Sequence, residues 1–469
     1  MSNHEKTGTS KTVVLITITM SSFLTPMALS TVNVALPTMA KELGMNAVSL
    51  SWVATAYMAA AAMFLVPLGR LADIVGRKKI FLIGTGVFTG ASFLLGMAPS
   101  TGFLIALRGI QGIGGSMVFG TGIAILTSVY PATERGKIFG INVAAVYFGL
   151  SAGPFLGGML TQYMGWRSVF FLNVPLGIAI LCFCIWKLRE EWAHAKGEKY
   201  DFAGSFIYCI MVIAIMYGFS LLPGIRALFF IVTGMAAMAA FLLWERRTKS
   251  PIMNVSLLIK NRVFMHSNVA ALINYSATYA VGFLLSLYLQ HIKGFSPLSA
   301  GTILVSQPIV QALFSPFAGK ISDRTEPRII ASSGMAMTAL GLFLLVFIKA
   351  TTPMWFVVGS LIVLGIGFAL FSSPNTNAIM SSVETQFYGV ASSTLSTMRL
   401  LGQMFSMGIA MILFAVYIGK AEITPARYPL LMKSVQVAFL AFAFMCLAGI
   451  YASLARGKML TNKEKQKAC

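Results

Sequence analysis

Two arginines lie far inside apolar stretches of the sequence, and each is followed by a glutamine at helical spacing. Gln111 comes three residues after Arg108, and Gln403 comes four residues after Arg399. On an α-helix these spacings place both side chains of a pair on one face. An arginine in apolar surroundings needs a wet cavity or a polar partner, because its insertion costs at least ~2.5–3.5 kcal/mol. The pairs predict a polar cavity between helices, although bonds from each arginine to backbone carbonyls would explain them as well.

Further amides occur in other apolar stretches and are candidates for lining the same cavity. Gln307 and Gln311 lie four residues apart and therefore share a helical face. Each amide taken singly is explained equally well by a hydrogen bond between helices. The candidate cavity residues are Asn33, Arg108, Gln111, Asn274, Gln307, Gln311, Arg399 and Gln403, with Asn375 and Asn377 as further polar positions.

The 14 acidic residues all lie in tails, in loops or near the ends of apolar stretches. Binding and release of protons needs a titratable group, and arginine effectively does not titrate. A proton carrier would have to be one of six peripheral residues, namely Asp73, Asp323, Glu384, Glu42, His266 and His291. A cavity that holds two arginines and no carboxylate favours neutral or anionic ligands over cations.

Metal chemistry and enzyme catalysis are not indicated by the remaining reactive residues. The 5 cysteines include no Cys-x-x-Cys pair, and the 4 histidines are scattered along the chain. Neither set has the spacing of a metal site, and no nucleophile–base pair occurs inside an apolar stretch. We therefore expect no metal, no cofactor and no enzymatic activity.

The composition identifies the elements that must position these residues. Hydrophobic residues make up 57% of the 469-residue chain and charged residues 10%, whereas soluble domains are about 25% charged. A membrane-spanning helix needs ~20 apolar residues. Fourteen stretches meet that length, which predicts an all-α, multi-pass membrane protein. They lie near 12–36, 47–68, 79–98, 102–129, 136–163, 168–187, 201–222, 226–244, 263–290, 298–319, 328–349, 353–373, 387–417 and 432–454.

The net charge of +21 comes from basic residues that alternate with the apolar stretches. With a cytoplasmic N-terminus, the cytoplasmic segments hold roughly three times as many Lys and Arg as the opposite segments. This distribution predicts both termini in the cytoplasm and a location in the plasma (inner) membrane. The basic loops would meet anionic membrane lipids, and no nucleic acid is expected as a partner.

A repeated motif divides the chain into two similar halves. Gly69-Arg-Leu-Ala-Asp73 follows the second apolar stretch, and Gly319-Lys-Ile-Ser-Asp323 follows the tenth. A repeat of six helices would place the second copy after the eighth stretch, so a helix pair has been inserted between the halves. We predict a six-helix bundle in residues 1–188, the inserted pair with its loops in 189–262, and a second bundle with a short basic tail in 263–469. Such halves around a central site are typical of transporters.

Glycines at four-residue spacing recur in the fifth apolar stretch, where a proline interrupts them. Small residues at this spacing let another helix approach closely, and proline tends to kink a helix. The motif is either a gating hinge or a plain packing surface, and it comprises Gly149, Gly153, Pro154, Gly157 and Gly158. A gating role is also expected for the repeated motif, with residues Gly69, Asp73, Gly76, Arg77, Gly319 and Asp323.

These motifs resemble those of the major facilitator superfamily. The segment from Gly69 to Lys79 is similar to that family's signature between helices 2 and 3. The segment from Gly149 to Gly158 is similar to the helix 5 motif of its drug:proton antiporters. The family's helix 4 motif is matched by Arg108, Gln111, Gly112 and Gly114. Fourteen helices resemble the fourteen-helix branch of those antiporters, which implies two six-helix bundles that rock about a central cavity and export driven by inward proton flow.

One position departs from that branch. Its members usually carry a membrane-embedded aspartate before the Asn-Val-Ala-Leu-Pro segment at 33–37, and the corresponding residue here is Ala28. We therefore predict a monomeric exporter of small amphipathic molecules, proton-coupled by resemblance, with a preference for neutral or anionic substrates. One alternative is an exporter or flippase of an anionic metabolite or lipid that is driven mainly by the membrane potential. A different class would be a non-transporting membrane receptor or scaffold.

Overall fold

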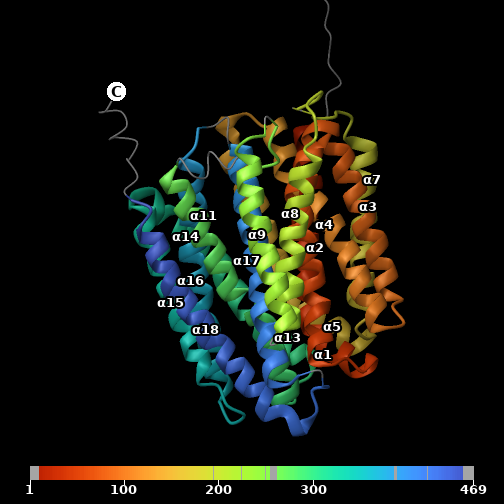
Figure 1. Cartoon of the computed structure of the whole chain (residues 1–469), viewed down its shortest axis with the longest axis vertical. Helices are drawn as coiled ribbons and strands as arrows, with labels where there is room; N and C mark the ends of the chain where they lie inside the picture. Colours follow the sequence, from red (N-terminus) through yellow and green to blue (C-terminus); the bar gives the residue numbers. More distant parts are fainter. Residues whose placement is uncertain are drawn as a thin grey trace, which may run out of the picture.

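Long helices make up nearly all of the computed structural model (Figure 1). The structure describes residues 10–193, 195–222, 224–248, 250–253, 261–384, 388–419 and 421–457. Over these residues the chain is all-helical apart from connections and one isolated bridge between Asn46 and Glu422. Fourteen helical segments are long and apolar enough to cross a membrane. The predicted fold class and the predicted number of helices are therefore confirmed.

The helices of the first half are α1 (Lys11–Leu43), α2 (Ala47–Val75), α3 (Arg77–Gly96), α4 (Thr101–Val129), α5 (Ala132–Met164), α6 (Ser168–Phe171) and α7 (Asn173–Lys187). A pair follows, formed by α8 (Phe202–Leu221) and α9 (Ile225–Glu245). The second half contains α11 (Arg262–Thr278), α12 (Ala280–Leu287), the π-helix η1 (Tyr288–Ile292), α13 (Pro297–Leu304), α14 (Ser306–Arg324), α15 (Pro327–Val346), α16 (Met354–Ser381), α17 (Tyr388–Tyr417), the short 3-10 helix η3 (Pro425–Arg427) and α18 (Tyr428–Leu454).

The helices are longer than the apolar stretches that predict them. The motif from Gly69 to Asp73 was expected after the second helix, but it lies inside the last turns of α2. Gly319 likewise lies inside α14. Hydropathy measures the length that is buried in a bilayer, whereas a helix continues into water as long as its backbone bonds are satisfied. Both copies of the repeat are therefore helix ends and not loops.

Side chains with hydrogen-bonding oxygens mark several helix starts. The Asn46 side chain accepts a hydrogen bond from the backbone N–H of Ser49 at 2.8 Å, where α2 begins. Asp201 caps α8 in the same way by accepting from Gly204 N–H at 2.9 Å. These bonds satisfy N–H groups that the first turn of a helix leaves free.

The packing of the first half recurs in the second half. In the first half, a Cβ placed on Gly114 of α4 would lie 2.8 Å from the carbonyl oxygen of Gly84 on α3. In the second half, a Cβ on Gly367 of α16 would lie 2.9 Å from the carbonyl oxygen of Gly334 on α15. Only glycine allows backbones to approach this closely, so the same device joins equivalent helices in both halves.

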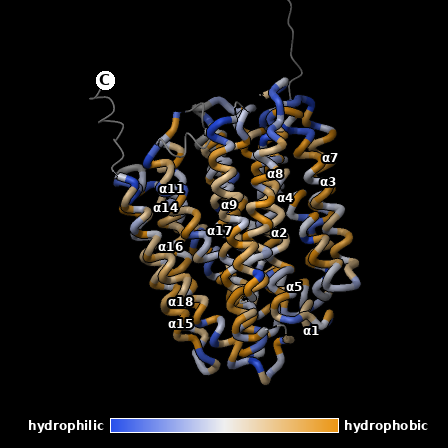
Figure 2. Tube along the Cα trace, in the orientation of Figure 1, coloured by the Kyte–Doolittle hydropathy of each residue, from blue (hydrophilic) through white to orange (hydrophobic). Residues whose placement is uncertain are grey.

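In Figure 1 the α8–α9 pair lies in front of the junction of the two halves, and α8 contacts both α2 and α17. Apolar residues cover the middle of the helices, and hydrophilic residues gather toward the two ends (Figure 2). The described chain begins and ends on the same side, at the top of Figure 1. We call the side that holds Ser10 and Gly457 the near end, and the opposite side the far end.

Candidate functional site

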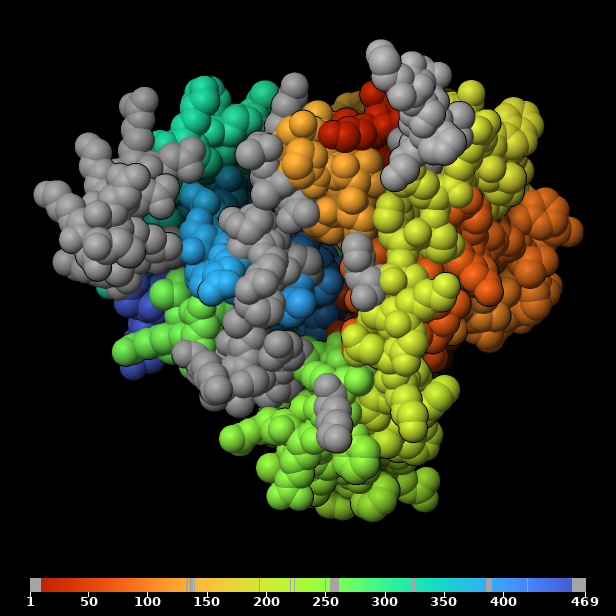
Figure 3. Space-filling model, turned by 90° about the horizontal axis from the view of Figure 1, so that it is seen from above, coloured from red at the N-terminus to blue at the C-terminus, as the bar shows by residue number. Residues whose placement is uncertain are grey.

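Two cavities lie between the halves. The near-end cavity has a volume of about 560 Å³, and its walls include the end of α2, α4, α17 and the Pro251–Met253 segment. The central cavity, of about 190 Å³, lies deeper and is lined by residues of both halves. Phe119 and Ser396 line both, so the two cavities adjoin each other at these residues. Seen from the near end, the surface is hollowed beside α17, which is blue in Figure 3.

Tight contacts between the halves close the far end. A Cβ on Gly158 of α5 would collide with the carbonyl oxygen of Pro297 at the start of α13. Gln290 Nε2 donates to the carbonyl oxygen of Val34 on α1 at 2.8 Å. The backbone N–H of Ala47 also donates to the carbonyl oxygen of Ala421 at 3.1 Å. The molecule is therefore open toward the near end and closed at the far end.

Helical periodicity positions the polar side chains of the central cavity. On α14, Gln307 and Gln311 face it together, as their spacing predicts. On α17, Arg399 and Gln403 do the same. With Asn33 of α1, five of the eight predicted cavity residues line this space.

Arg399 gives the central cavity its charge. The guanidinium carbon lies 5.0 Å from the ring centroid of Tyr275, in a cation–π contact. Its Nε is buried and has no hydrogen-bond partner. Among the described lining residues Arg399 is the one charged side chain, and aspartate and glutamate do not occur there. A ligand with an acceptor oxygen would complete the hydrogen bonding of this arginine.

Arg108 and Gln111 were predicted to line the cavity, but the structure places them behind its wall. Arg108 is only 1% exposed, and its guanidinium carbon lies 4.7 Å from the ring centroid of Tyr57, which does line the cavity. Its Nε donates to the carbonyl oxygen of Val53 at 2.9 Å, and a terminal nitrogen donates to Gln111 Oε1 at 2.6 Å. Gln111 Nε2 in turn donates to Ser92 Oγ at 2.8 Å. The prediction that Arg108 and Gln111 share a helical face is therefore correct, but hydrogen bonds to protein groups satisfy the charge of Arg108.

Asn274 is also buried away from the described cavity lining, with neither of its amide atoms bonded. Adjacent helical residues point about 100° apart. The next residue, Tyr275, faces the cavity together with Thr278 and Tyr279. The side chain of Asn274 therefore points away from the face that lines the cavity.

The sequence reasoning missed the tyrosines of the central cavity, which are Tyr57, Tyr147, Tyr275 and Tyr279. Tyr147 of α5 shares a hydrogen bond of 2.6 Å with Ser372 of α16, across the two halves. A usable signal was present, because Tyr275 and Tyr279 are four residues apart and mark one helical face. The cavity therefore combines flat aromatic surfaces with amides and one cation.

The glycine motif of α5 acts as a packing surface on two sides. A Cβ on Gly149 would collide with a carbonyl oxygen of α1, and a Cβ on Gly157 would lie 2.6 Å from another carbonyl oxygen of α1. Gly153 faces Ser30 of α1, whereas Gly158 faces α13 of the other half. Pro154 lines the central cavity. The motif thus joins α5 to α1 and closes the far end.

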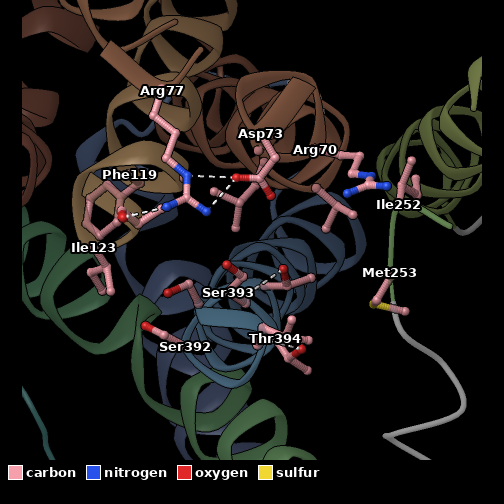
Figure 4. A pocket seen from close by; sticks show the side chains of 18 of the residues that line it. Arg70, Asp73, Arg77, Phe119, Ile123, Ile252, Met253, Ser392, Ser393 and Thr394 are labelled. Carbon is pink, nitrogen blue, oxygen red and sulfur yellow. Dashed lines mark hydrogen bonds and ion pairs between the residues drawn. The ribbon is translucent and has the colours of Figure 1, made fainter. Parts of the chain in front are cut away.

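The near-end cavity contains the first copy of the repeated motif (Figure 4). Arg77 Nε donates to Asp73 Oδ1 at 2.7 Å, and a terminal nitrogen reaches Ala124 O and Ser128 Oγ, each at 2.7 Å. Gly69 lines the same cavity, and Gly76 ends α2 with φ at +131°. Arg77 therefore ties the junction of α2 and α3 to the end of α4.

Of the predicted proton carriers, Asp73 lines the near-end cavity, and the other described carriers are not among the lining residues of either cavity. Glu42 forms an ion pair with Arg167 at the far end. His266 Nδ1 lies 2.9 Å from the carbonyl oxygen of Arg262. Glu384 is exposed, and Nε2 of His291 is buried without a partner. The side chain of Asp323 lies outside the described residues.

Comparison with known proteins identifies a family and several similar proteins. A sequence model of the Major Facilitator Superfamily matches residues 18–200 and 268–468. The riboflavin transporter RibZ of Clostridioides difficile is 32% identical over 85% of this chain and 87% of its own. The multidrug resistance protein Stp of Mycobacterium tuberculosis is 30% identical over 79% of this chain and 70% of its own.

The tetracenomycin C resistance and export protein of Streptomyces glaucescens is 26% identical over 83% of this chain and 73% of its own. A crystal structure of a bacterial homolog of the human lysosomal transporter Spinster, in an inward-facing and unoccupied conformation, superposes with a TM-score of 0.69. It covers 95% of this chain and 97% of its own at 14% identity, which shows a common fold.

Proposed function

This chain belongs to the major facilitator superfamily and is a transporter rather than an enzyme, and we propose that it exports neutral or anionic amphipathic small molecules. The composition of the central cavity carries this proposal. Its described lining holds one cation, four tyrosines and several amides, and no carboxylate. A lipophilic cation would meet an arginine there without a counter-charge, whereas an acidic or carbonyl group would be attracted to it.

The arrangement of the cavities supports alternating access. The central cavity adjoins the near-end cavity, and contacts between α5 and α13 close the far end. The excess of basic residues in the near-end loops supports a cytoplasmic location for that end under the positive-inside rule. A cytoplasmic substrate would thus reach Arg399 first, before the halves rock to open the far end of a monomeric protein in the plasma membrane.

The driving force follows from the charge of the substrate. An inside-negative potential favours export of an anion by ~2.3 kcal/mol per charge per 100 mV. A neutral substrate gains nothing from the potential and would need coupling to protons, as the resemblance to drug:proton antiporters suggests. The two cases are separated by imposing each gradient alone.

Transport of a flavin is a second candidate function, favoured by the 32% identity to a riboflavin transporter. Riboflavin has a flat ring system with carbonyl oxygens and no charge at neutral pH. Tyrosine rings provide surfaces for such a ring, and Arg399 provides a donor for its carbonyl groups. This candidate shares the neutral substrate class of the main proposal.

The test is transport in proteoliposomes under an imposed pH gradient and, separately, an imposed potential. The panel contains a quaternary-ammonium dye, an organic anion, a neutral amphipath and riboflavin. We expect movement of the anion or of a neutral compound, and loss of at least ten-fold in rate on Arg399→Gln. Arg427→Gln is the control, because Arg427 lies at the far end outside both described linings.

Rapid transport of the dye without transport of the anion or the neutral compounds would refute the proposed preference. An unchanged rate in the Arg399→Gln variant would remove Arg399 from the substrate site. Transport of riboflavin with no transport of the anion would favour the second candidate.

A further inference from the structure

A buried carboxylate ends α9, outside the set that the sequence singled out. Glu245 is 4% exposed. Its Oε2 accepts a hydrogen bond from the backbone N–H of Met253 at 3.2 Å. Its Oε1 is buried and has no hydrogen-bond partner. A buried carboxylate oxygen without a partner is costly, and a proton on that oxygen relieves the cost.

A second carboxylate faces the first across the start of α8. Asp201 accepts from Gly204 N–H through Oδ1 and from Trp244 Nε1 through Oδ2, both at 2.9 Å. A Cβ placed on Gly204 would lie 2.7 Å from the free Glu245 Oε1 and closer still to Asp201 Oδ2. The two oxygens therefore lie on the same side of Gly204, where the missing side chain leaves room for both. The negative charge of Asp201 so close to Glu245 disfavours a second charge there.

The charged neighbours of this pair do not neutralise it fully. Arg70 of α2 lies near enough to attract Glu245, but a terminal nitrogen of Arg70 is engaged by Glu198 at 2.5 Å. The hydroxyl of Tyr200, next to Asp201, donates to the carbonyl oxygen of Pro67. Other charged side chains of the adjoining segments are exposed, namely Lys196, Lys199, Arg246 and Arg247.

The pair is linked to the near-end cavity by one hydrogen bond. Met253 donates its N–H to Glu245 and lines that cavity together with Pro251 and Ile252. Arg70, which attracts Glu245, lines the same cavity (Figure 4). The charge on Glu245 therefore acts directly on two parts of the cavity wall.

We propose that Asp201 and Glu245 form a proton-binding site at the near end of the α8–α9 pair, and that its protonation controls how firmly Pro251–Met253 is held in the cavity wall. Without the proton, the Glu245 carboxylate holds Met253 N–H and attracts Arg70. With the proton bound, the acid loses its negative charge and its hold on both weakens. The proton resides outside the central cavity, and this site does not depend on the identity of the substrate.

Trp244 provides a reporter of the site, because its indole N–H is bonded to Asp201. The purified full-length protein is titrated from pH 4 to pH 9 while tryptophan fluorescence is recorded. The chain has 6 tryptophans, so the Trp244 signal is obtained as wild type minus Trp244→Phe. We expect a single transition in this difference signal. Glu245→Gln mimics the protonated acid and should abolish the transition.

Glu134→Gln is the matched control, because it removes an exposed near-end carboxylate that pairs with Lys11 and leaves Asp201, Glu245 and Arg70 untouched. It should retain the transition. Gly204→Ala is a second variant, whose Cβ pushes the carboxylates apart, and it should shift the midpoint by at least half a pH unit. A transition that persists unchanged in Glu245→Gln, or one that is absent from wild type, would overturn the proposal.

A transport measurement tests the link to the cavity wall. In proteoliposomes the rate for the compound that wild type moves best is compared at pH 6 and pH 8. Glu245→Gln should reduce the ratio of the two rates at least three-fold toward unity, and Glu134→Gln should preserve it. If the titration succeeds and the ratio does not change, the proposed control of the cavity wall is wrong. If wild type moves nothing in the panel, the proposed function fails while the titration still decides whether the proton site exists.

Discussion

At the scale of single residues, two similar arginines have different roles because their surroundings differ. Arg108 has protein acceptors and an aromatic cover, whereas the Nε of Arg399 has no partner and its guanidinium faces a cavity. Bonds to the protein satisfy the first, and the second keeps a free donor toward the cavity, which is why we propose it as the ligand-binding arginine. Sequence spacing alone treats the two as equivalent.

Arg108→Ala should therefore destabilise the protein by about 2–4 kcal/mol, because it leaves buried partners of a charged group unsatisfied. Arg399→Ala should change stability much less and reduce transport instead. The measurement is the fraction of each purified variant that remains monodisperse after heating, followed by transport assays of the surviving protein. Equal losses of stability in both variants would contradict the distinction.

At the scale of elements, close contacts between helices carry more information than the polar motifs. Most glycines of the α5 motif pack against α1, and one packs against α13. One helix therefore serves both the packing within its half and the closure of the far end. The same spacing that predicts a packing surface gives no indication of which neighbour it meets. That assignment came from the structure.

Gly158→Ala should hold the far end apart, because its Cβ would collide with the backbone of α13 and neither side can move independently. Spin labels on α5 and α13 at the far end should show a longer distance than in the otherwise unmodified protein.

Gly140→Ala is the control on the same helix, since a Cβ there meets no atom within 4 Å. It should leave the distance between the labels unchanged. A distance in Gly158→Ala equal to that of the control would mean that the contact does not close the far end.

At the scale of the whole molecule, both ends of the described chain lie on one side of a bundle of fourteen membrane-spanning helices. A chain that crosses a membrane an even number of times must begin and end on the same side. The side of the membrane depends on the distribution of basic residues, which is a property of the loops and not of the packed helices.

We predict that the near end is cytoplasmic. Green fluorescent protein fused after Cys469 should fluoresce, and alkaline phosphatase at the same position should be inactive. Insertion of the phosphatase at the far-end connection near Thr351 should give the opposite result, with an active enzyme. Active phosphatase at the C-terminus would reverse the predicted orientation and, with it, the proposed direction of transport.

The amino-acid sequence alone predicts the fold class, the number of helices and the pairing of residues on one helix, such as Gln307 with Gln311 and Arg108 with Gln111. These properties depend on local composition and on helical periodicity, which act over a few turns. It also exposed the family motifs that point to a transporter.

The packed structure was needed to show which helical faces meet. It placed Arg108 behind Tyr57, turned Asn274 away from the central cavity and gathered tyrosines from both halves around Arg399. It also brought Glu245 to Asp201, because α9 returns antiparallel along α8. These contacts depend on how helices distant in sequence rotate and pack against one another. A periodic pattern along one helix contains no information about its neighbour.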